Sequence, residues 1–292
     1  MKIQFTAAFL KKLEMLSIVS KKLFAGRMKG ERRSPRRGQS VEFADFRDYS
    51  QGDDYRHIDW NAYARLEGLF LKLFVEEEDL HIHVLLDASR SMDFGRPRKF
   101  DFAAHAAAAI AYICLSNLDR VSLTAFSGEG LRTLPFQHGK QNIFAVIDFL
   151  ERLQAGGSTE LTPSVGEFVQ RDPRRGLVIL ISDFLSEDGF QPALTRLKYS
   201  KYEPVALQVL SPDEVEPPIG GDWRFIDSET GAALDLSLGS RAVNTYRRRL
   251  RGYCDALDDF CRQRGIASLR SRTDQSFEDL ILKYFRSAAL IA

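Results

Sequence analysis

The chain has 292 residues, 44% of them apolar, with 41 Lys plus Arg against 40 Asp plus Glu. The apolar share is enough for a buried core, and the balanced charge argues against a dedicated nucleic-acid-binding protein, which carries a basic excess. Three cysteines without a CxxC pair exclude a disulfide framework or zinc finger and favour a reducing compartment. We therefore expect a cytoplasmic protein without a transmembrane segment, since no apolar run reaches the roughly 18 residues that a membrane helix needs.

Residues 1–80 are predicted to form an N-terminal segment distinct from the rest. An amphipathic helix is expected over 5–24, followed by a basic arm over 27–37 and an aromatic, charged stretch over 41–80. The alternation of residues 69–75 predicts a strand. The basic arm is typical of a solvated loop; the alternative, contact with nucleic acid or an anionic lipid, leaves peripheral membrane attachment open.

From residue 82 the pattern changes to strands that alternate with helices, which we assign to one domain over 81–292. Such alternation predicts an α/β fold with a doubly wound, mainly parallel sheet and helices on both faces. An irregular segment is expected over 211–239, with a short hairpin at 223–226 and 233–236. The predicted strands are 82–86, 121–126, 131–136 at an edge, 177–182, 204–210 and 266–269, and the predicted helices are 99–118, 141–153, 162–170, 191–199, 240–263 and 277–290.

Three loops carry oxygen-bearing side chains where strands of this sheet are expected to end. Asp87, Ser89 and Ser91 follow the first strand, Thr159 ends a Gly-Gly-Ser-Thr stretch, and Asp183 follows the strand over 177–182. Ligands of α/β sheets bind at the carboxyl ends of the strands, and hard oxygen ligands suit Mg²⁺, Ca²⁺ or Mn²⁺. The sequence therefore predicts a divalent-metal site, with Mg²⁺ preferred and Ca²⁺ or Mn²⁺ as alternatives.

Simpler roles compete with metal binding at these positions. Ser and Asp after a strand commonly cap a following helix, so Asp183 and the Asp87–Ser91 loop have that alternative. Ser158 competes with Thr159 as the ligand of its loop.

Histidines and cysteines elsewhere in the chain are assigned structural roles. His81 and His83 alternate on a strand and are expected on a solvated face, with a metal pair as the alternative. Cys254 and Cys261 lie seven apart on a predicted helix and are expected to be buried core thiols.

The motif order resembles a known binding site. Asp87-x-Ser89-x-Ser91, then Thr159, then Asp183 is similar to the metal-ion-dependent adhesion site of von Willebrand factor A domains. Upstream, the chain resembles the signature of the bacterial family called domain of unknown function 58, in which a von Willebrand factor A-like domain follows. The resembling residues are Glu42-Phe43, Arg47, Tyr49, Gly52-Asp53, Arg56, Ile58-Asp59-Trp60 and Ala64-Arg65, with departures at Asn61 and Tyr63.

The resemblance implies a protein-binding function. It implies a metal-dependent adaptor that pairs with a MoxR-type AAA+ ATPase and takes part in the assembly or remodelling of other proteins. Residues of the upstream signature are expected to form an ionic network that docks the segment onto the sheet, and a partner-binding surface is their alternative. The network residues are Arg47, Asp53, Arg56, Asp59 and Arg65, and the alternative partner-binding surface includes Trp60 as well.

We expect that the chain is not an enzyme. No loop after a predicted strand offers a His, Lys or Cys that could act as base or nucleophile. The alternative is a metal-dependent phosphohydrolase-like enzyme with Asp87 as nucleophile. Ser89, however, stands where such enzymes carry a second Asp as general acid.

Overall fold

The computed structural model describes residue 13 and residues 42–50, 58–60, 62–63, 68–75, 81–158, 160–217, 222–226, 233–237 and 239–276. The chain forms two compact units, Met28–Asp79 on its own and Met1–Arg27 together with Leu80–Ala292. Leu13 is fully buried in the core of the larger unit. The other residues of the predicted helix over 5–24, the basic arm, Thr159 and the predicted helix over 277–290 lie outside the described residues.

The smaller unit holds a two-stranded antiparallel sheet. Strand β2 (Phe70–Val75) confirms the strand predicted from residue 69 and pairs with β1 (Glu42–Asp48). The sequence analysis missed β1, because its two aromatic residues, Phe43 and Phe46, are three apart and give no alternation at period two. Its pairing with β2 depends on tertiary structure and cannot be predicted from the β1 residues alone.

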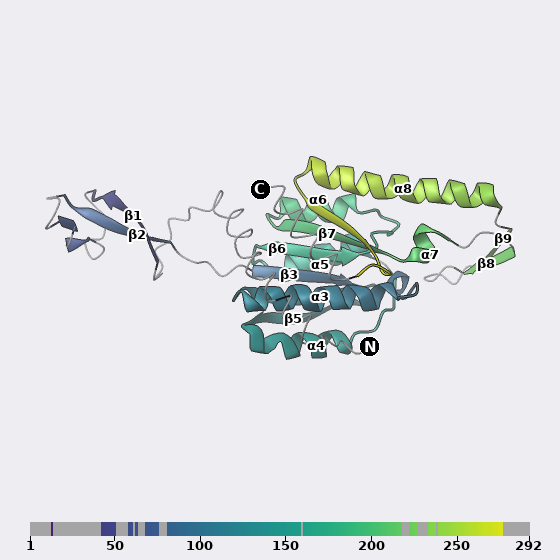
Figure 1. Ribbon diagram of the computed structural model, residues 1–292, viewed down its shortest axis with the longest axis horizontal. Coiled ribbons are helices and arrows are strands. Elements are labelled where there is room, and N and C mark those ends of the chain that lie inside the picture. Colours follow the sequence, from purple (N-terminus) through teal and green to yellow (C-terminus); the bar gives the residue numbers. More distant parts are fainter. Residues whose placement is uncertain are drawn as a thin grey trace. The chain divides into compact units, whose positions relative to one another are not determined.

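The larger unit is built on a six-stranded sheet in the order β10-β7-β6-β3-β4-β5 (Figure 1). Only β5, at the edge, runs antiparallel to its neighbour, so the predicted mainly parallel sheet and its edge strand are confirmed. The strands are β3 (His81–Asp87), β4 (Arg120–Ser127), β5 (Gly130–His138), β6 (Leu177–Ser182), β7 (Glu203–Leu210) and β10 (Ala267–Arg272).

Helices cover both faces of this sheet, as predicted (Figure 1). One core joins α3 and α4 to the strands, and the other joins α5, α6 and α8 to them. The Ala-rich α3 is buried on nearly every side, and its small side chains let it lie close against the sheet. The helices are α3 (Lys99–Ser116), α4 (Ile143–Glu151), α5 (Leu161–Arg171), α6 (Gln191–Tyr199) and α8 (Ser240–Gln263), with 3-10 turns η2 (Arg90–Met92) and η3 (Lys140–Asn142).

The segment after β7 is more regular than predicted. The expected hairpin is present as β8 (Asp222–Ile226) and β9 (Ala233–Ser237), which pair antiparallel. A short helix, α7 (Pro212–Val215), precedes it and was not predicted, although Ser211-x-x-Glu214 with a following proline is a capping-box sequence. In the part of the chain that the structure describes, no helix is long and apolar enough to cross a membrane.

The strand order reverses beside β3. The chain passes from β3 through α3 to β4 on one side, and β6 then pairs with the opposite edge of β3. Leu86 lies opposite Ile181 in this parallel pair, so the residues that follow both strands emerge side by side. In doubly wound sheets a crevice for ligands opens at such a switch point.

Candidate functional site

The first residue of the site, Asp87, is the last residue of β3 and is fully buried. Its Oδ1 accepts the Ser89 N–H at 2.9 Å, and its Oδ2 accepts the Ser182 hydroxyl at 2.6 Å. Burial, followed by the charge of Asp183, raises the pKa of Asp87 to about 6. Both carboxylate oxygens are thus held in place by hydrogen bonds, while the negative charge lacks full compensation.

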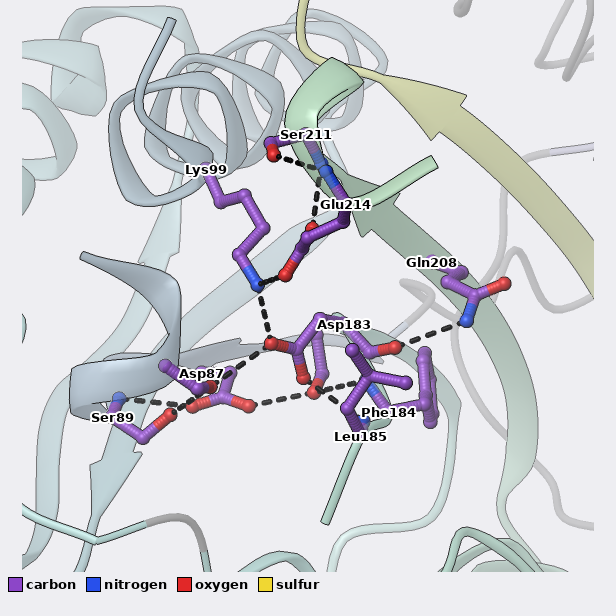
Figure 2. A network of polar contacts seen from close by, with 11 residues as sticks. Asp87, Ser89, Lys99, Asp183, Phe184, Leu185, Gln208, Ser211 and Glu214 are labelled. Carbon is purple, nitrogen blue, oxygen red and sulfur yellow. Dashed lines mark hydrogen bonds and ion pairs between the residues drawn. The ribbon is translucent and has the colours of Figure 1, made fainter. Parts of the chain in front are cut away.

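Hydroxyls connect this loop to Asp183, the residue after β6. The Ser89 and Ser91 Oγ atoms are 3.1 Å apart, and the Ser91 hydroxyl donates to Asp183 Oδ2 at 2.9 Å. Asp183 Oδ1 accepts the Leu185 N–H at 3.0 Å. Four of the five predicted site residues therefore meet at the switch point, and Figure 2 shows three of them, Asp87, Ser89 and Asp183, together.

Thr159, the fifth predicted residue, lies outside the described residues, but the structure describes the loop that leads to it. The Gly156 N–H donates to the Ala88 carbonyl at 2.8 Å, and the Arg90 N–H donates to the Gly157 carbonyl at 2.9 Å. Gly157 has φ +74°, a left-handed conformation that glycine adopts without a steric penalty. These bonds hold the Gly-Gly-Ser stretch against the loop of Asp87 and Ser89.

A lysine that the sequence analysis did not assign to the site lies against Asp183. Lys99 Nζ donates to Asp183 Oδ2 at 2.7 Å and to Glu214 Oε1 at 2.5 Å, as Figure 2 shows. The Lys99 side chain is 1% exposed. Burial opposes its charge, but the attraction of Asp183 and then of Glu214 outweighs this, and the pKa of Lys99 is raised.

Lys99 was not considered for the site because it lies in the first turn of α3, not in a loop after a predicted strand. Lys99 does not serve as a base, however, because an ammonium held between two carboxylates keeps its proton. The sequence held a small signal: a lysine in the first turn of a helix interacts unfavourably with the helix dipole, and a nearby carboxylate would compensate for this.

Glu214 is fixed from its own helix. Its backbone N–H donates to the Ser211 hydroxyl at 3.2 Å, and its Oε2 accepts the Ser211 N–H at 2.7 Å. The capping box therefore leaves Oε1 for Lys99. Through this contact, α7 is joined to the end of β6.

The simpler roles considered for these residues do not match the structure. Ser89 precedes η2 but makes no side-chain capping bond, and α6 begins at Gln191 with Phe190, not Asp183, before it. Asp87 accepts one hydrogen bond on each carboxylate oxygen, from the Ser89 N–H and the Ser182 hydroxyl, and these bonds fix its orientation. The geometry instead favours carboxylates that orient neighbouring hydroxyls.

The donor set fits a hard divalent cation. The adjacent Ser89 and Ser91 hydroxyls are neutral oxygen ligands, and the buried Asp87 and Asp183 place two negative charges next to them. Lys99 offsets part of this charge through its contacts with Asp183 and Glu214. Among the described residues no cluster of three His, Cys, Asp or Glu side chains could hold a metal, so hydroxyl ligands are essential to the prediction.

His83 is not on a solvated face, so that expectation was wrong. It is buried on the side of β3 that faces Phe168 and Tyr202, with ring centroids 5.1 and 5.7 Å away. The expectation for Cys254 and Cys261 is confirmed, because both thiols are buried and free. The histidine was misassigned because its face of the strand is covered by side chains from distant segments.

The signature residues of the smaller unit are described only in part. Asp59 is buried and accepts the Ala62 N–H at 3.3 Å, while Trp60 is 62% exposed and packs edge-on against Tyr63. Arg47 lies in β1, where only its backbone is described, and Asp53, Arg56 and Arg65 lie outside the described residues. The ionic network expected among them stays a prediction.

Comparisons with known proteins connect the chain to others without an assigned role. The model of a family described as "Protein of unknown function DUF58" matches residues 45–252. The uncharacterized protein Rv1480 of Mycobacterium tuberculosis is 26% identical over 280 residues, which are 94% of this chain and 88% of that protein.

Two solved structures show weaker likenesses. The conserved hypothetical protein BatB of Bacteroides thetaiotaomicron is 16% identical and aligns over 72% of this chain and 99% of its own, with a TM-score of 0.46. Proximal thread matrix protein 1 of the mussel byssus, with a zinc occupied MIDAS motif, is 17% identical. It aligns over 72% of this chain and 48% of its own, with a TM-score of 0.41.

Proposed function

Since this chain belongs to the DUF58 family, we propose that its larger unit is a metal-dependent protein-binding module that acts as an adaptor rather than an enzyme. The observation that supports this most is the meeting of Asp87, Ser89, Ser91 and Asp183 where the strand order reverses. These residues come from two separate loops and present hydroxyl and carboxylate oxygens in one place.

Mg²⁺ is the proposed ion, with Ca²⁺ and Mn²⁺ as alternatives. The hydroxyls of Ser89, Ser91 and Thr159 would hold it, while Asp87 and Asp183, tied down by their own hydrogen bonds, would orient those hydroxyls and supply charge. Bound Mg²⁺ keeps some positions for water or an incoming oxygen. A carboxylate of a partner protein could take such a position in a charge-assisted bond.

The proposed partner is a MoxR-type AAA+ ATPase, and the proposed process is the assembly or remodelling of other proteins in the cytoplasm. The family resemblance supports this pairing. Size-exclusion chromatography of the purified chain mixed with the ATPase, once in Mg²⁺ and once in EDTA, tests this pairing. A complex is expected in the Mg²⁺ buffer and not in the EDTA buffer. Complex formation that is equal in both buffers would contradict the metal-dependent binding.

Asp87→Asn is expected to abolish stabilisation by Mg²⁺. At 100 times its dissociation constant a ligand adds about 2.7 kcal/mol to the free energy of unfolding. The wild-type chain should show an increase of this order when thermal unfolding is followed with and without Mg²⁺. The variant should show none, because the amide removes the negative charge while keeping the shape.

Asp148→Asn is the matched control. Asp148 is 59% exposed on α4 and pairs with Arg152, away from the candidate site, so its variant should respond to Mg²⁺ as the wild type does. A response retained in Asp87→Asn, or absent from the wild-type chain at millimolar Mg²⁺, would contradict the proposed site.

A further inference from the structure

A groove of about 450 Å³ lies between α7, α8 and the ends of β7 and β10. Its aliphatic surface comes from Leu210, Val215 and Leu250. Its remaining lining is Glu216, Arg247, Arg251, Cys254 and Arg270. The α8 residues among these follow the spacing i, i+3, i+4, i+7, so one face of α8 forms a wall of the groove.

The three guanidinium groups that line the groove differ in their hydrogen-bond partners. Arg270 donates to Gln208 Oε1 at 2.7 Å and to Asp258 Oδ2 at 2.8 Å. For Arg247 and Arg251, the described part of the chain provides no acidic partner. The Arg247 Nε atom is buried and makes no hydrogen bond there.

A buried donor without an acceptor is costly, because it has lost its hydrogen bond to water. Native structures seldom leave such groups unsatisfied, and a ligand is one of the groups that can satisfy them. Here the donor belongs to a cation that lines a groove, so the missing acceptor is expected to be an anion. Arg251, exposed on the next turn of α8, adds a second positive charge.

The groove is linked to the metal site by contacts that pass through α7. Glu214 contacts Lys99, which contacts Asp183, and the next two residues, Val215 and Glu216, line the groove. In Figure 1, α7 follows β7 at the end of the sheet. Residues of one short helix therefore contact the metal site on one side and the groove on the other.

We propose that the groove binds an acidic peptide segment of a partner protein. Carboxylates of the segment pair with Arg247 and Arg251, and an aliphatic side chain between them packs on Leu210, Val215 and Leu250. The guanidinium fork matches a carboxylate with two parallel hydrogen bonds. The aliphatic surface of Leu210, Val215 and Leu250 favours a peptide over a nucleic acid, because a peptide can place an aliphatic side chain between its carboxylates and a nucleic acid has none.

This inference deepens the proposed function, on which the identity of the partner rests, but the groove itself does not require a metal ion. The test therefore uses a fluorescein-labelled Glu-Glu-Leu-Glu-Glu peptide and the full chain in EDTA, with fluorescence anisotropy as the readout. Saturable binding is expected in wild type. If the chain does not bind Mg²⁺ at the candidate site, peptide binding in EDTA should be unchanged. The metal-site proposal and the groove proposal can therefore be refuted independently.

Arg247→Ala and Arg251→Ala should each raise the dissociation constant of the peptide at least tenfold, which corresponds to about 1.4 kcal/mol. Arg247→Lys, which keeps the charge but loses the planar fork, should raise it by an intermediate factor. The matched control is Arg248→Ala, on the same helix but exposed and outside the groove, and it should bind within twofold of wild type. Circular dichroism melts check that each variant is folded.

Four outcomes would overturn the proposal. One is equal binding of a Gln-Gln-Leu-Gln-Gln peptide, and another is an equal loss of affinity in Arg248→Ala. The third is binding that appears only after Glu278→Gln and Asp279→Asn are introduced together, which would assign the groove to the chain's own residues 277–292. Preference for a single-stranded oligonucleotide over the peptide would likewise replace the acidic peptide by a nucleic acid.

Discussion

Replacing Lys99 by Met is expected to lower the free energy of unfolding by about 3–5 kcal/mol, as removal of one partner from a buried ion pair does. Lys99 Nζ lies 2.7 Å from Asp183 Oδ2 and 2.5 Å from Glu214 Oε1, and its side chain is 1% exposed. Met fills a similar volume, so the loss comes from two carboxylates left without a cation. Urea unfolding followed by circular dichroism measures it.

Arg98→Met provides a matched control from the adjacent position. Arg98 also pairs with two carboxylates, Asp93 at 2.7 Å and Asp101 at 2.6 Å, but its side chain is 37% exposed. Exposed ion pairs contribute about 0–1 kcal/mol, so this variant should lose little. Equal losses in Arg98→Met and Lys99→Met would show that burial of the ammonium is not what makes Lys99 important.

A double variant separates charge from packing. Adding Glu214→Gln to Lys99→Met removes one of the two uncompensated charges, so part of the lost stability should return. Neighbouring residues of one network are expected to be non-additive in this way. Strict additivity of the two substitutions would contradict a shared ion network.

When the pH falls from 7 to 4, the free energy of unfolding of the wild-type chain is expected to fall by about 3 kcal/mol more than that of the His83→Gln variant. The neutral His83 ring is fully partnered: the Ser122 hydroxyl donates to Nδ1, and Nε2–H donates to the Arg174 carbonyl, each at 3.0 Å. Burial, only partly opposed by the charge of Asp172 at 3.9 Å, lowers the pKa of His83 to about 4.

The direction follows from which state binds the proton. Between the pKa of an unfolded-state histidine, about 6.5, and the folded-state pKa of about 4, only the unfolded chain is protonated at this residue. The contribution of His83 is therefore complete above pH 6.5 and decreases as the pH falls toward 4. The His83→Gln variant has no titrating side chain at this position, so its free energy of unfolding should lack this pH-dependent contribution.

Asp87 acts in the opposite direction, so the comparison with the variant is necessary. Its pKa is raised to about 6 in the folded chain, and lowering the pH through 6 therefore relieves a destabilising charge. Both chains contain Asp87, so its contribution cancels in the difference between their free energies of unfolding. Urea unfolding of both chains at several pH values gives this difference. A His83 ring proton whose NMR shift titrates near pH 6.5 would contradict the prediction.

Much of the fold could be predicted because its signals are local. The apolar run over 177–182 and the periodicity over 191–199 and 240–263 predicted β6, α6 and α8 with their observed bounds. The strand β1 and the helix α7 were missed, the first for lack of alternation and the second because its capping box lies in a proline-rich stretch.

The convergence of the candidate site could also be predicted in outline. Asp87 and Asp183 each end a parallel strand, and parallel strands of one sheet place such residues along the same edge. Whether β3 and β6 are neighbours is not encoded in either strand. Their pairing, with Leu86 opposite Ile181, is what brings the two carboxylates together.

The sequence by itself determined the approximate positions of most strands and helices of the larger unit, and which residues have the chemistry to hold a metal, because periodicity and side-chain type act over a few residues. Only the tertiary structure decided the surroundings of those residues. Lys99 meets Asp183 across 84 positions and Glu214 across 115, and His83 is enclosed by residues from separate segments. Burial and charge compensation depend on all the segments that pack around a side chain, and no local pattern specifies that packing.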